Sequence, residues 1–131
     1  MSEKKILIID DDAFIRRPLE FILREEGFLP VTAVDGEDGL AKLEGGRPDL
    51  IFLDVMMPGM DGFAVCRRVR TDPRFSSIPV IMLTAKGQEG DRDRGLAAGA
   101  TEFISKPYSP SELLRRVREI LSERTSGSVG T

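Results

Sequence analysis

The chain has 131 residues, of which 40% are hydrophobic and 31% charged, so it is long enough for one folded domain and is not a disordered segment. Its net charge of -3, from 19 basic and 22 acidic side chains, gives no general reason to expect nucleic acid or an anionic membrane as a partner. It contains no histidine and a single cysteine, Cys66, which excludes an internal disulfide, zinc sites of the usual kind, Ser-His-Asp or Cys-His catalysis and a role as a phosphohistidine donor.

Apolar runs that predict strands alternate five times with segments of helical periodicity. In chain order the pattern predicts a strand at 6–9, a helix from Asp12 to Gly27, a strand at 28–33, a helix at 37–43, a strand at 50–53, a helix at 63–69, a strand at 80–83, a helix at 89–98, a strand at 103–104 and a helix from 109. This alternation predicts a single three-layer α/β domain, in which helices cover both faces of a parallel sheet. We expect the domain to span residues 4–122, and residues 123–131 to be a flexible tail or the start of a linker.

Proline and aspartate residues refine this prediction. Pro30 has no amide donor for a strand ladder, so the second strand is expected at an edge of the sheet. Pro18 lies inside the first helix, where we expect a kink or a tightened turn but not the loss of the helix. We interpret Asp12, Asp35 and Asp61 as turn residues or helix caps.

Four of the predicted strands lead into polar residues of different chemical types. Asp10 and Asp11 follow the first strand, Asp54 the third and Thr84 the fourth, and Lys106 comes two residues after Ile104. Ligands of open α/β sheets bind outside the carboxyl ends of the strands, so these side chains are expected around one crevice. Carboxylates, a hydroxyl and an ammonium together can hold a hard cation and a phosphoryl group.

The pattern resembles the receiver domain of two-component response regulators over about residues 4–121. The segments that carry the resemblance are Ile6 to Asp11, Leu53-Asp54 with Met57 to Gly62, Leu83-Thr84-Ala85, and Ser105 to Tyr108. Their order and spacing make the resemblance specific. It implies a flavodoxin-like fold with strand order 2-1-3-4-5, an order for which the chemotaxis member of this family is a standard example.

The acidic residues suit Mg²⁺, or Mn²⁺, because Mg²⁺ prefers octahedral oxygen coordination and keeps several of its waters. Asp10, Asp11 and Asp54 can each supply a carboxylate oxygen or hold one of those waters. The resemblance implies that Asp11, Asp54 and the backbone carbonyl of Met56 bind the metal directly, and that Asp10 binds it through a water.

The resemblance also implies that Asp54 is the phosphoacceptor, and an aspartate is chemically able to form an acyl phosphate. The metal would neutralise one phosphoryl oxygen, Lys106 a second, and the hydroxyl of Thr84 with nearby backbone donors of Thr84 and Ala85 a third. The donor would be a phosphohistidine on a separate protein, either a sensor histidine kinase or a histidine phosphotransfer protein. The chain itself is therefore expected to be a signalling domain that catalyses only its own phosphorylation and dephosphorylation.

Phosphorylation is expected to act on Thr84 and on Phe103, which stands at a position where the family often has tyrosine. The Thr84 hydroxyl would move toward the phosphoryl oxygens, Phe103 would turn inward, and the surface of the fourth helix, fifth strand and fifth helix would change shape. That surface carries charged residues whose placement is similar to receiver domains that pair through this face in winged-helix transcription regulators: Arg92, Glu102, Glu112 and Arg116. The same charges are also compatible with an ordinary solvated surface.

The resemblance leaves the output open, and we expect either an unidentified output partner or an output domain outside this chain. We expect a monomer or a phosphorylation-dependent dimer that binds neither nucleic acid nor membrane directly. The apolar runs are too short to span a bilayer and no signal-peptide pattern is present, which favours a cytoplasmic location.

Two finer predictions concern the pocket. The Lys106-Pro107 peptide is expected to be cis, which would aim the lysine into the crevice. Phosphorylated Asp54 is expected to lose its phosphoryl group slowly, because the resemblance places Met56 and Lys86 beside the path of the attacking water. Met56 cannot orient a water by a strong hydrogen bond, and Lys86 cannot accept its proton.

Two other classes of protein remain as alternatives. A Mg²⁺-dependent phosphatase or phosphotransferase would also pass through an aspartyl phosphate, but such enzymes commonly carry a second acid two residues after the nucleophile, where this chain has Met56. A degenerate receiver that acts only as an interaction scaffold is disfavoured by the presence of all five pocket residues.

Overall fold

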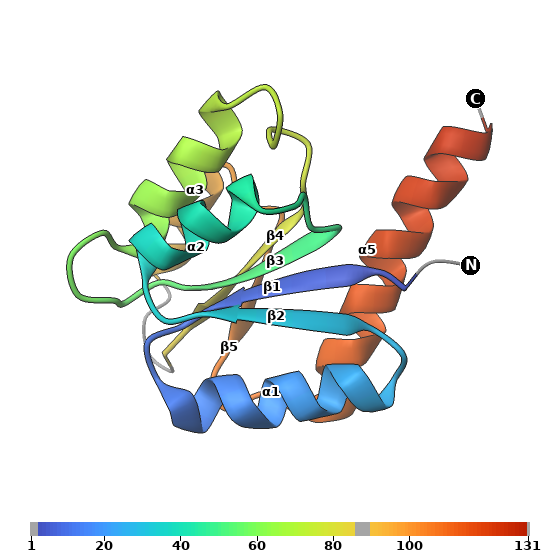
Figure 1. Ribbon diagram of the computed structural model, residues 1–131, viewed down its shortest axis with the longest axis horizontal. Helices are drawn as coiled ribbons and strands as arrows, with labels where there is room; N and C mark the ends of the chain where they lie inside the picture. The colour runs from blue at the N-terminus through green and yellow to red at the C-terminus, as the bar shows by residue number, and fades with distance from the viewer. Residues whose placement is uncertain (1–2, 86–89, 131) are drawn as a thin grey trace.

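The computed structural model describes residues 3–85 and 90–130, with side chains described as far as residue 122. Five strands alternate with five helices (Figure 1). In chain order they are β1 (Lys5–Ile9), α1 (Ala13–Glu25), β2 (Leu29–Ala33), α2 (Gly36–Glu44), β3 (Leu50–Asp54), α3 (Gly62–Thr71), β4 (Val80–Thr84), α4 (Gly90–Ala98), β5 (Glu102–Ser105) and α5 (Pro110–Gly130). The predicted alternation is confirmed, with bounds that differ from the sequence estimate by a few residues.

The strands form one parallel sheet in the order β2-β1-β3-β4-β5, which confirms the predicted flavodoxin-like fold. The edge position of β2 is confirmed, and its Pro30 pairs in register with Ile6 of β1. All five residues of β3 and of β4 are buried, because these central strands have helices on both sides. Because all five strands are parallel, their carboxyl ends lie at the same end of the sheet, where side chains from several strands can converge.

Two separate hydrophobic clusters hold the helices on the two faces. Helices α1 and α5 cover one face through residues such as Leu19, Leu23 and Val117, and α2, α3 and α4 cover the other (Figure 1). Cys66 is a buried member of the second group, on α3. At about 25 cal/mol per Å² of apolar area removed from water, this double burial is the main term that stabilises the layers.

The aspartates that we interpreted as caps begin three of the helices. Asp12 accepts a hydrogen bond from the Phe14 amide at 2.9 Å, and Asp35 and Asp61 do the same for amides at the starts of α2 and α3. Each cap satisfies an amide that has no partner inside its helix. Helix α1 continues through Pro18, as expected.

The last helix runs almost to the end of the chain. Helix α5 continues to Gly130, so the backbone is helical through most of the segment that we expected to be a flexible tail from residue 123. Adding a residue to an existing helix forms one hydrogen bond for each residue that is fixed, which allows a helix to run past its last packed turn. Figure 1 shows these last turns extending away from the sheet. The division of the chain at residue 122 stays a prediction.

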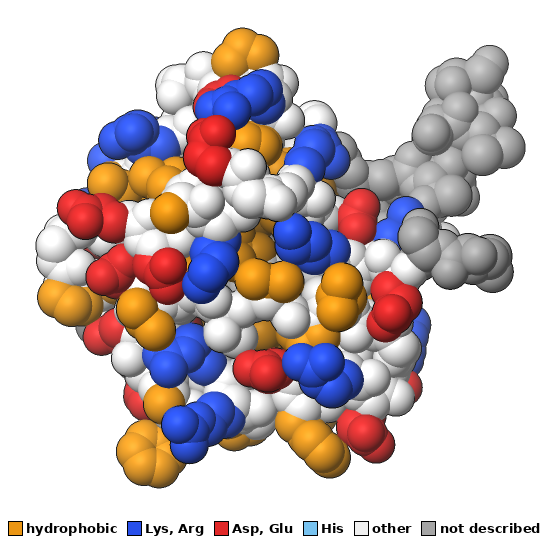
Figure 2. Space-filling model, in the orientation of Figure 1, with side chains coloured by type: hydrophobic (Ala, Val, Ile, Leu, Met, Phe, Trp, Pro, Cys, Tyr) orange, Lys and Arg blue, Asp and Glu red, His pale blue; other side chains and the backbone are white. Residues whose placement is uncertain are grey.

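The described surface shows no large region of one charge on the face drawn in Figure 2, where basic and acidic side chains are interspersed. Within the described part of the chain, no helix is both long enough and apolar enough to cross a membrane.

Candidate functional site

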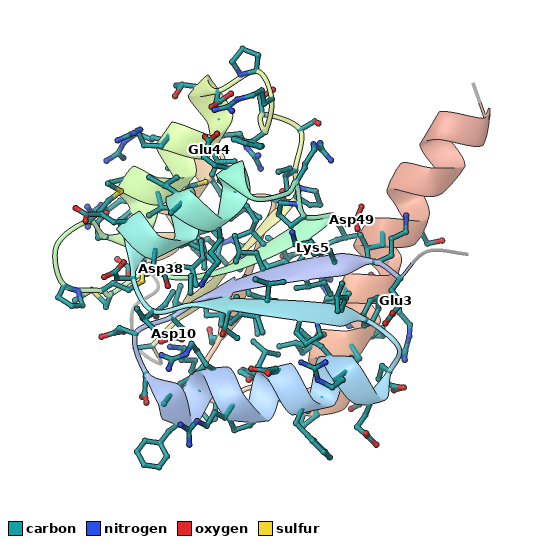
Figure 3. The ribbon with its side chains drawn as sticks, viewed as in Figure 1. Glu3, Lys5, Asp10, Asp38, Glu44 and Asp49 are labelled. Atoms are coloured by element: carbon teal, nitrogen blue, oxygen red, sulfur yellow. The ribbon has the colours of Figure 1, made fainter. Side chains whose placement is uncertain are left out.

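Polar side chains from four strand ends meet at the carboxyl edge of the sheet. Asp10, Asp54 and Thr84 are the buried polar or charged residues of the described chain, with exposed fractions of 0%, 6% and 6%. Figure 3 shows Asp10 at this edge of the sheet, with Lys5 and Asp49 at the opposite edge. Buried charges carry a large desolvation cost unless they are paired, so two buried carboxylates and a buried hydroxyl in one place indicate a functional site.

Lys106, which follows β5, enters this pocket and contacts both buried carboxylates. Its Nζ atom lies 3.0 Å from Asp54 Oδ1 and 3.3 Å from Asp10 Oδ2. The Lys106 amide donates to the Thr84 carbonyl at 2.7 Å, which continues the β4–β5 pairing into the loop. The Lys106-Pro107 peptide is cis, which confirms that prediction.

Asp10 is held rigidly by its neighbours. The Asp12 amide donates to Asp10 Oδ1 at 2.9 Å, and the Asp10 amide donates to the Ala33 carbonyl at 3.2 Å. Arg16 donates to the Asp10 carbonyl at 2.9 Å. Both carboxylate oxygens of Asp10 are therefore engaged, one by this amide and the other by Lys106.

Gly62 fixes the backbone on which Asp54 stands, a role that sequence reasoning missed. A Cβ atom at position 62 would lie 2.4 Å from the Asp54 carbonyl oxygen, so only glycine allows this approach. The Gly62 amide also donates to the Val55 carbonyl at 3.0 Å. A glycine at the start of a helix beside a strand end could have signalled the close approach, but glycine is also common at such positions for conformational reasons.

Asp10, Asp11 and Asp54 each offer a carboxylate oxygen, and these oxygens lie within 4.8 Å of one another. Asp11 is exposed whereas the other two are buried, so the cluster opens to solvent on one side. An all-oxygen set that leaves room for water fits Mg²⁺ or Mn²⁺ and does not fit metals that need nitrogen or sulfur ligands. The residues present therefore fit the cation that the sequence predicts.

The pocket disfavours the ionised forms of its two buried aspartates. Burial and the charge of Asp10 raise the pKa of Asp54 to about 6 from its usual 3.8, although Lys106 acts in the opposite direction. Burial also raises the pKa of Asp10. Burial alone would lower the pKa of Lys106, but its hydrogen bond with Asp54 and the charges of both aspartates outweigh that effect and raise it. A site with these properties gains stability when a cation enters.

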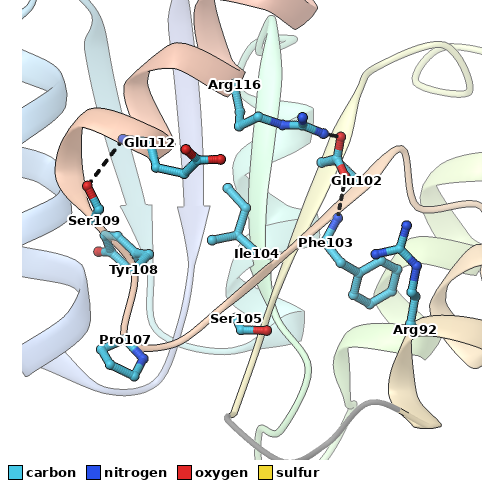
Figure 4. Close-up of a pocket in the computed structure, with 10 residues that line it drawn as sticks. All are labelled: Arg92, Glu102, Phe103, Ile104, Ser105, Pro107, Tyr108, Ser109, Glu112 and Arg116. Carbon is cyan, nitrogen blue, oxygen red and sulfur yellow. Dashed lines mark hydrogen bonds and ion pairs between the residues drawn. The ribbon is translucent and has the colours of Figure 1, made fainter.

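Phe103 lies partly buried on β5 beside the helices, at the edge of a second hollow (Figure 4). This hollow brings together the four charged residues that the sequence analysis singled out on this surface: Arg92, Glu102, Glu112 and Arg116. Arg116 forms an ion pair with Glu102, which connects α5 to β5.

The sequence analysis also expected Met56 and Lys86 beside the path of the attacking water. The Met56 side chain is 69% exposed, in the loop that follows β3. Lys86 lies outside the described residues.

Comparison with known proteins points to one family. The response regulator receiver domain family matches residues 6–118. The chain is 44% identical to the "Probable transcriptional regulator ycf27" of Cyanophora paradoxa, over 100% of this chain and 54% of that protein. It is 42% identical to the phosphate regulon transcriptional regulatory protein PhoB of Escherichia coli, over 90% of this chain and 52% of PhoB. The chain thus spans about half the length of these curated relatives.

Solved structures agree with this result. A response regulator from Chloroflexus aurantiacus is 38% identical with a TM-score of 0.89, covering 92% of this chain and 99% of that one. The chemotaxis protein CheY4 of Vibrio cholerae is 35% identical with a TM-score of 0.85, covering 90% of this chain and 98% of that one.

Proposed function

This chain belongs to the family of response regulator receiver domains, and we propose that it signals by accepting a phosphoryl group on the carboxylate of Asp54. The observation that carries this assignment is the difference between the two buried aspartates. Asp10 is fully buried and both of its carboxylate oxygens already accept hydrogen bonds. Asp54 keeps some exposure, and Lys106 contacts its Oδ1 atom. Of the two buried carboxylates, Asp54 is therefore the one that an incoming phosphorus can reach.

The acidic cluster supports a bound Mg²⁺ or Mn²⁺ during this reaction. We propose that Asp11, Asp54 and the Met56 carbonyl are direct ligands and that Asp10 acts through a water, which agrees with the complete burial of Asp10 and the exposure of Asp11. When bound, the cation neutralises charge on the phosphoryl oxygens.

The remaining pocket residues bind and orient the phosphoryl group. Lys106 already lies 3.0 Å from Asp54 Oδ1, so its ammonium is placed to neutralise an oxygen of a group attached there. The Thr84 hydroxyl and the Ala85 amide, at the end of β4, would donate to another oxygen. Fixed donors of this kind act by positioning and charge stabilisation and need no rearrangement at the moment of transfer.

The phosphoryl donor is a phosphohistidine on a sensor histidine kinase or a histidine phosphotransfer protein. A bond forms between phosphorus and an Asp54 carboxylate oxygen as the phosphorus–nitrogen bond of the donor breaks. The imidazole nitrogen keeps the electron pair and takes up a proton. These 131 residues contain no histidine, so the donor histidine lies outside them.

Phosphorylation of Asp54 changes the positions of Thr84 and Phe103, and through them the surface formed by α4, β5 and α5. Movement of Thr84 toward the phosphoryl group changes the space available to Phe103, and the hollow lined by Arg92 and Arg116 changes with it (Figure 4). That surface would contact an output partner or a second receiver. Its curated relatives are about twice as long and are named as transcriptional regulators, which supports gene expression as the output.

The proposal is tested by incubating the chain with acetyl phosphate and Mg²⁺ and measuring its intact mass. One added phosphoryl group is expected on the wild-type chain and none on Asp54→Asn. Asp93→Asn, an exposed aspartate on α4, is the matched control and should be phosphorylated like the wild type. Phosphorylation of Asp54→Asn would contradict the assignment.

A further inference from the structure

The ring of Phe103 lies directly over Gly95 in the middle of α4. A Cβ atom at position 95 would lie 1.8 Å from the Cζ atom of the ring and 2.8 Å from each Cε atom. Real side chains never approach so closely, so the present position of the ring requires a glycine at position 95. Gly95 is buried, which means that the ring fills the space between this helix and the sheet.

Helix α4 supplies little apolar packing of its own. Among its described residues, Gly95 and Ala98 are buried, and Leu96 is 47% exposed. A large side chain from β5 thus provides apolar contact that a typical amphipathic helix would supply from its own buried face. The position of α4 on the sheet should therefore depend on where the Phe103 ring lies.

The far end of α4 is anchored independently. The Nε atom of Arg70 donates to the Gly99 carbonyl at 2.7 Å, and the Thr101 amide donates to the Val80 carbonyl at 2.8 Å. A change in ring position would consequently be taken up by the part of α4 that precedes these anchors, which is the part that carries Arg92 at the edge of the hollow (Figure 4).

The strand register connects this ring to the phosphoacceptor pocket. Phe103 pairs with Met82, and Thr84 is two residues further along the same strand as Met82. Because side chains alternate between the faces of a sheet, Phe103, Met82 and Thr84 point to the face that α4 covers. The clusters agree, since Met82 and Phe103 belong to one of them and Leu83 and Ile104 to the other.

We infer that Gly95 is a positioning residue for the switch: its missing side chain creates the seat that Phe103 occupies against α4. The inference rests on the proposed function, because it specifies how phosphorylation at Asp54 would reach the α4–β5–α5 surface. Closing the seat with a methyl group should leave phosphoryl acceptance intact and keep the ring out of this seat, whether or not Asp54 is phosphorylated. The surface would then no longer respond to phosphorylation.

The seat itself is tested by thermal melting of Gly95→Ala beside Gly90→Ala. Gly90 lies in the same helix with no atom near its added Cβ, so Gly90→Ala should not lower Tm. Gly95→Ala should lower Tm in the wild-type background and should cause no loss in a Phe103→Leu background, because leucine has no atoms at the Cε and Cζ positions. An equal loss in both backgrounds, or no loss in either, overturns the inference. If Gly95→Ala fails to fold, the double variant must still fold, and its failure would overturn the inference too.

The role in signalling is tested by NMR of the full chain with ¹³C-labelled phenylalanine, with the Phe103 signals assigned from their disappearance in Phe103→Leu. In the wild type and in Gly90→Ala, we expect a nuclear Overhauser contact between the Phe103 ring and Gly95, and a shift of the ring signals after treatment with acetyl phosphate and Mg²⁺. In Gly95→Ala the shift should be lost, although intact mass shows the same phosphoryl addition. A shift equal to that of the wild type would refute the inference.

The two proposals fail in different ways. If no variant gains a phosphoryl group, the proposed function is wrong, and the melting comparison still decides whether Gly95 seats the ring. If the wild type is phosphorylated and its ring signals shift, but Gly95→Ala responds equally, the function stands and the role of Gly95 is wrong.

Discussion

Replacing Asp54 with asparagine should stabilise the fold in the absence of a divalent cation. The wild-type pocket holds Asp10 and Asp54 side by side with one ammonium, and it raises the pKa of Asp54 to about 6. Asparagine keeps the shape and can still accept a hydrogen bond from Lys106, but it removes the buried charge. In the wild type, the buried charge of Asp54 raises the free energy of the native state but not that of the unfolded state. The variant removes this difference and should therefore be more stable.

The magnitude follows from the pKa of Asp54. The rise from 3.8 to about 6 corresponds to about 3 kcal/mol, at 1.36 kcal/mol for each pKa unit. Since the folded pKa is the higher one, the stability that protonation of Asp54 contributes is fully present below pH 3.8 and is lost as the pH rises through about 6. The advantage of Asp54→Asn should thus be about 1 kcal/mol at pH 4.5 and about 3 kcal/mol at pH 7.5.

The assay is urea denaturation with a chelator present, at both pH values. With a slope of about 2 kcal/mol per molar urea, the variant's midpoint should lie about 1.5 M above the wild type at pH 7.5. Asp93→Asn makes the same chemical change at an exposed position and should show no comparable gain. The reasoning is refuted if Asp54→Asn is no more stable than the wild type at pH 7.5, or if its advantage does not change with pH.

Three further predictions concern the same pocket. Millimolar Mg²⁺ should raise the wild-type Tm relative to NaCl of matched ionic strength. At a hundredfold excess over Kd the free energy of unfolding should rise by about 2.7 kcal/mol, and an unchanged melting curve would argue against a cation at Asp10, Asp11 and Asp54. Gly62→Ala should lower the free energy of unfolding by about 1–3 kcal/mol, because the added Cβ collides with the Asp54 carbonyl. Gly45→Ala is the control and should cause no such loss, because the nearest atom to its added Cβ is 3.5 Å away. Equal urea midpoints for the two variants would contradict this prediction. The phosphorylated chain should decay slowly, and the double variant of Met56→Asn with Lys86→Glu should decay faster when followed by intact mass; equal decay rates would show that these side chains do not control access of water.

The fold and most of the pocket could be predicted because both depend on short-range sequence patterns. Apolar runs that end in Asp10, Asp54 and Thr84 reveal both the buried strands and the polar residues at their carboxyl ends. Pro30 places its strand at the sheet edge for a purely local reason, the missing amide donor.

The features that were missed depend on distances between segments far apart in the sequence. Nothing local distinguishes Gly62 and Gly95 from glycines that serve turns, and their roles appear only when the Asp54 carbonyl and the Phe103 ring are placed beside them. The hydrogen bond from Arg70 to the Gly99 carbonyl likewise joins α3 to the end of α4, and no spacing in the sequence predicts it. The end of α5 could not be located from the sequence, because its serine- and glycine-containing end has a composition typical of linkers.

The central claim is that Asp54 alone carries the phosphoryl group, and locating the modification tests it most directly. The chain is treated with acetyl phosphate and Mg²⁺, the acyl phosphate is reduced with borohydride to give homoserine, and the peptides are sequenced by mass spectrometry. We expect homoserine at position 54 and unmodified aspartate at Asp10 and Asp11, with no homoserine when Mg²⁺ is replaced by a chelator. Homoserine at position 10 or 11, or a phosphoryl group that resists borohydride and base, would contradict the account.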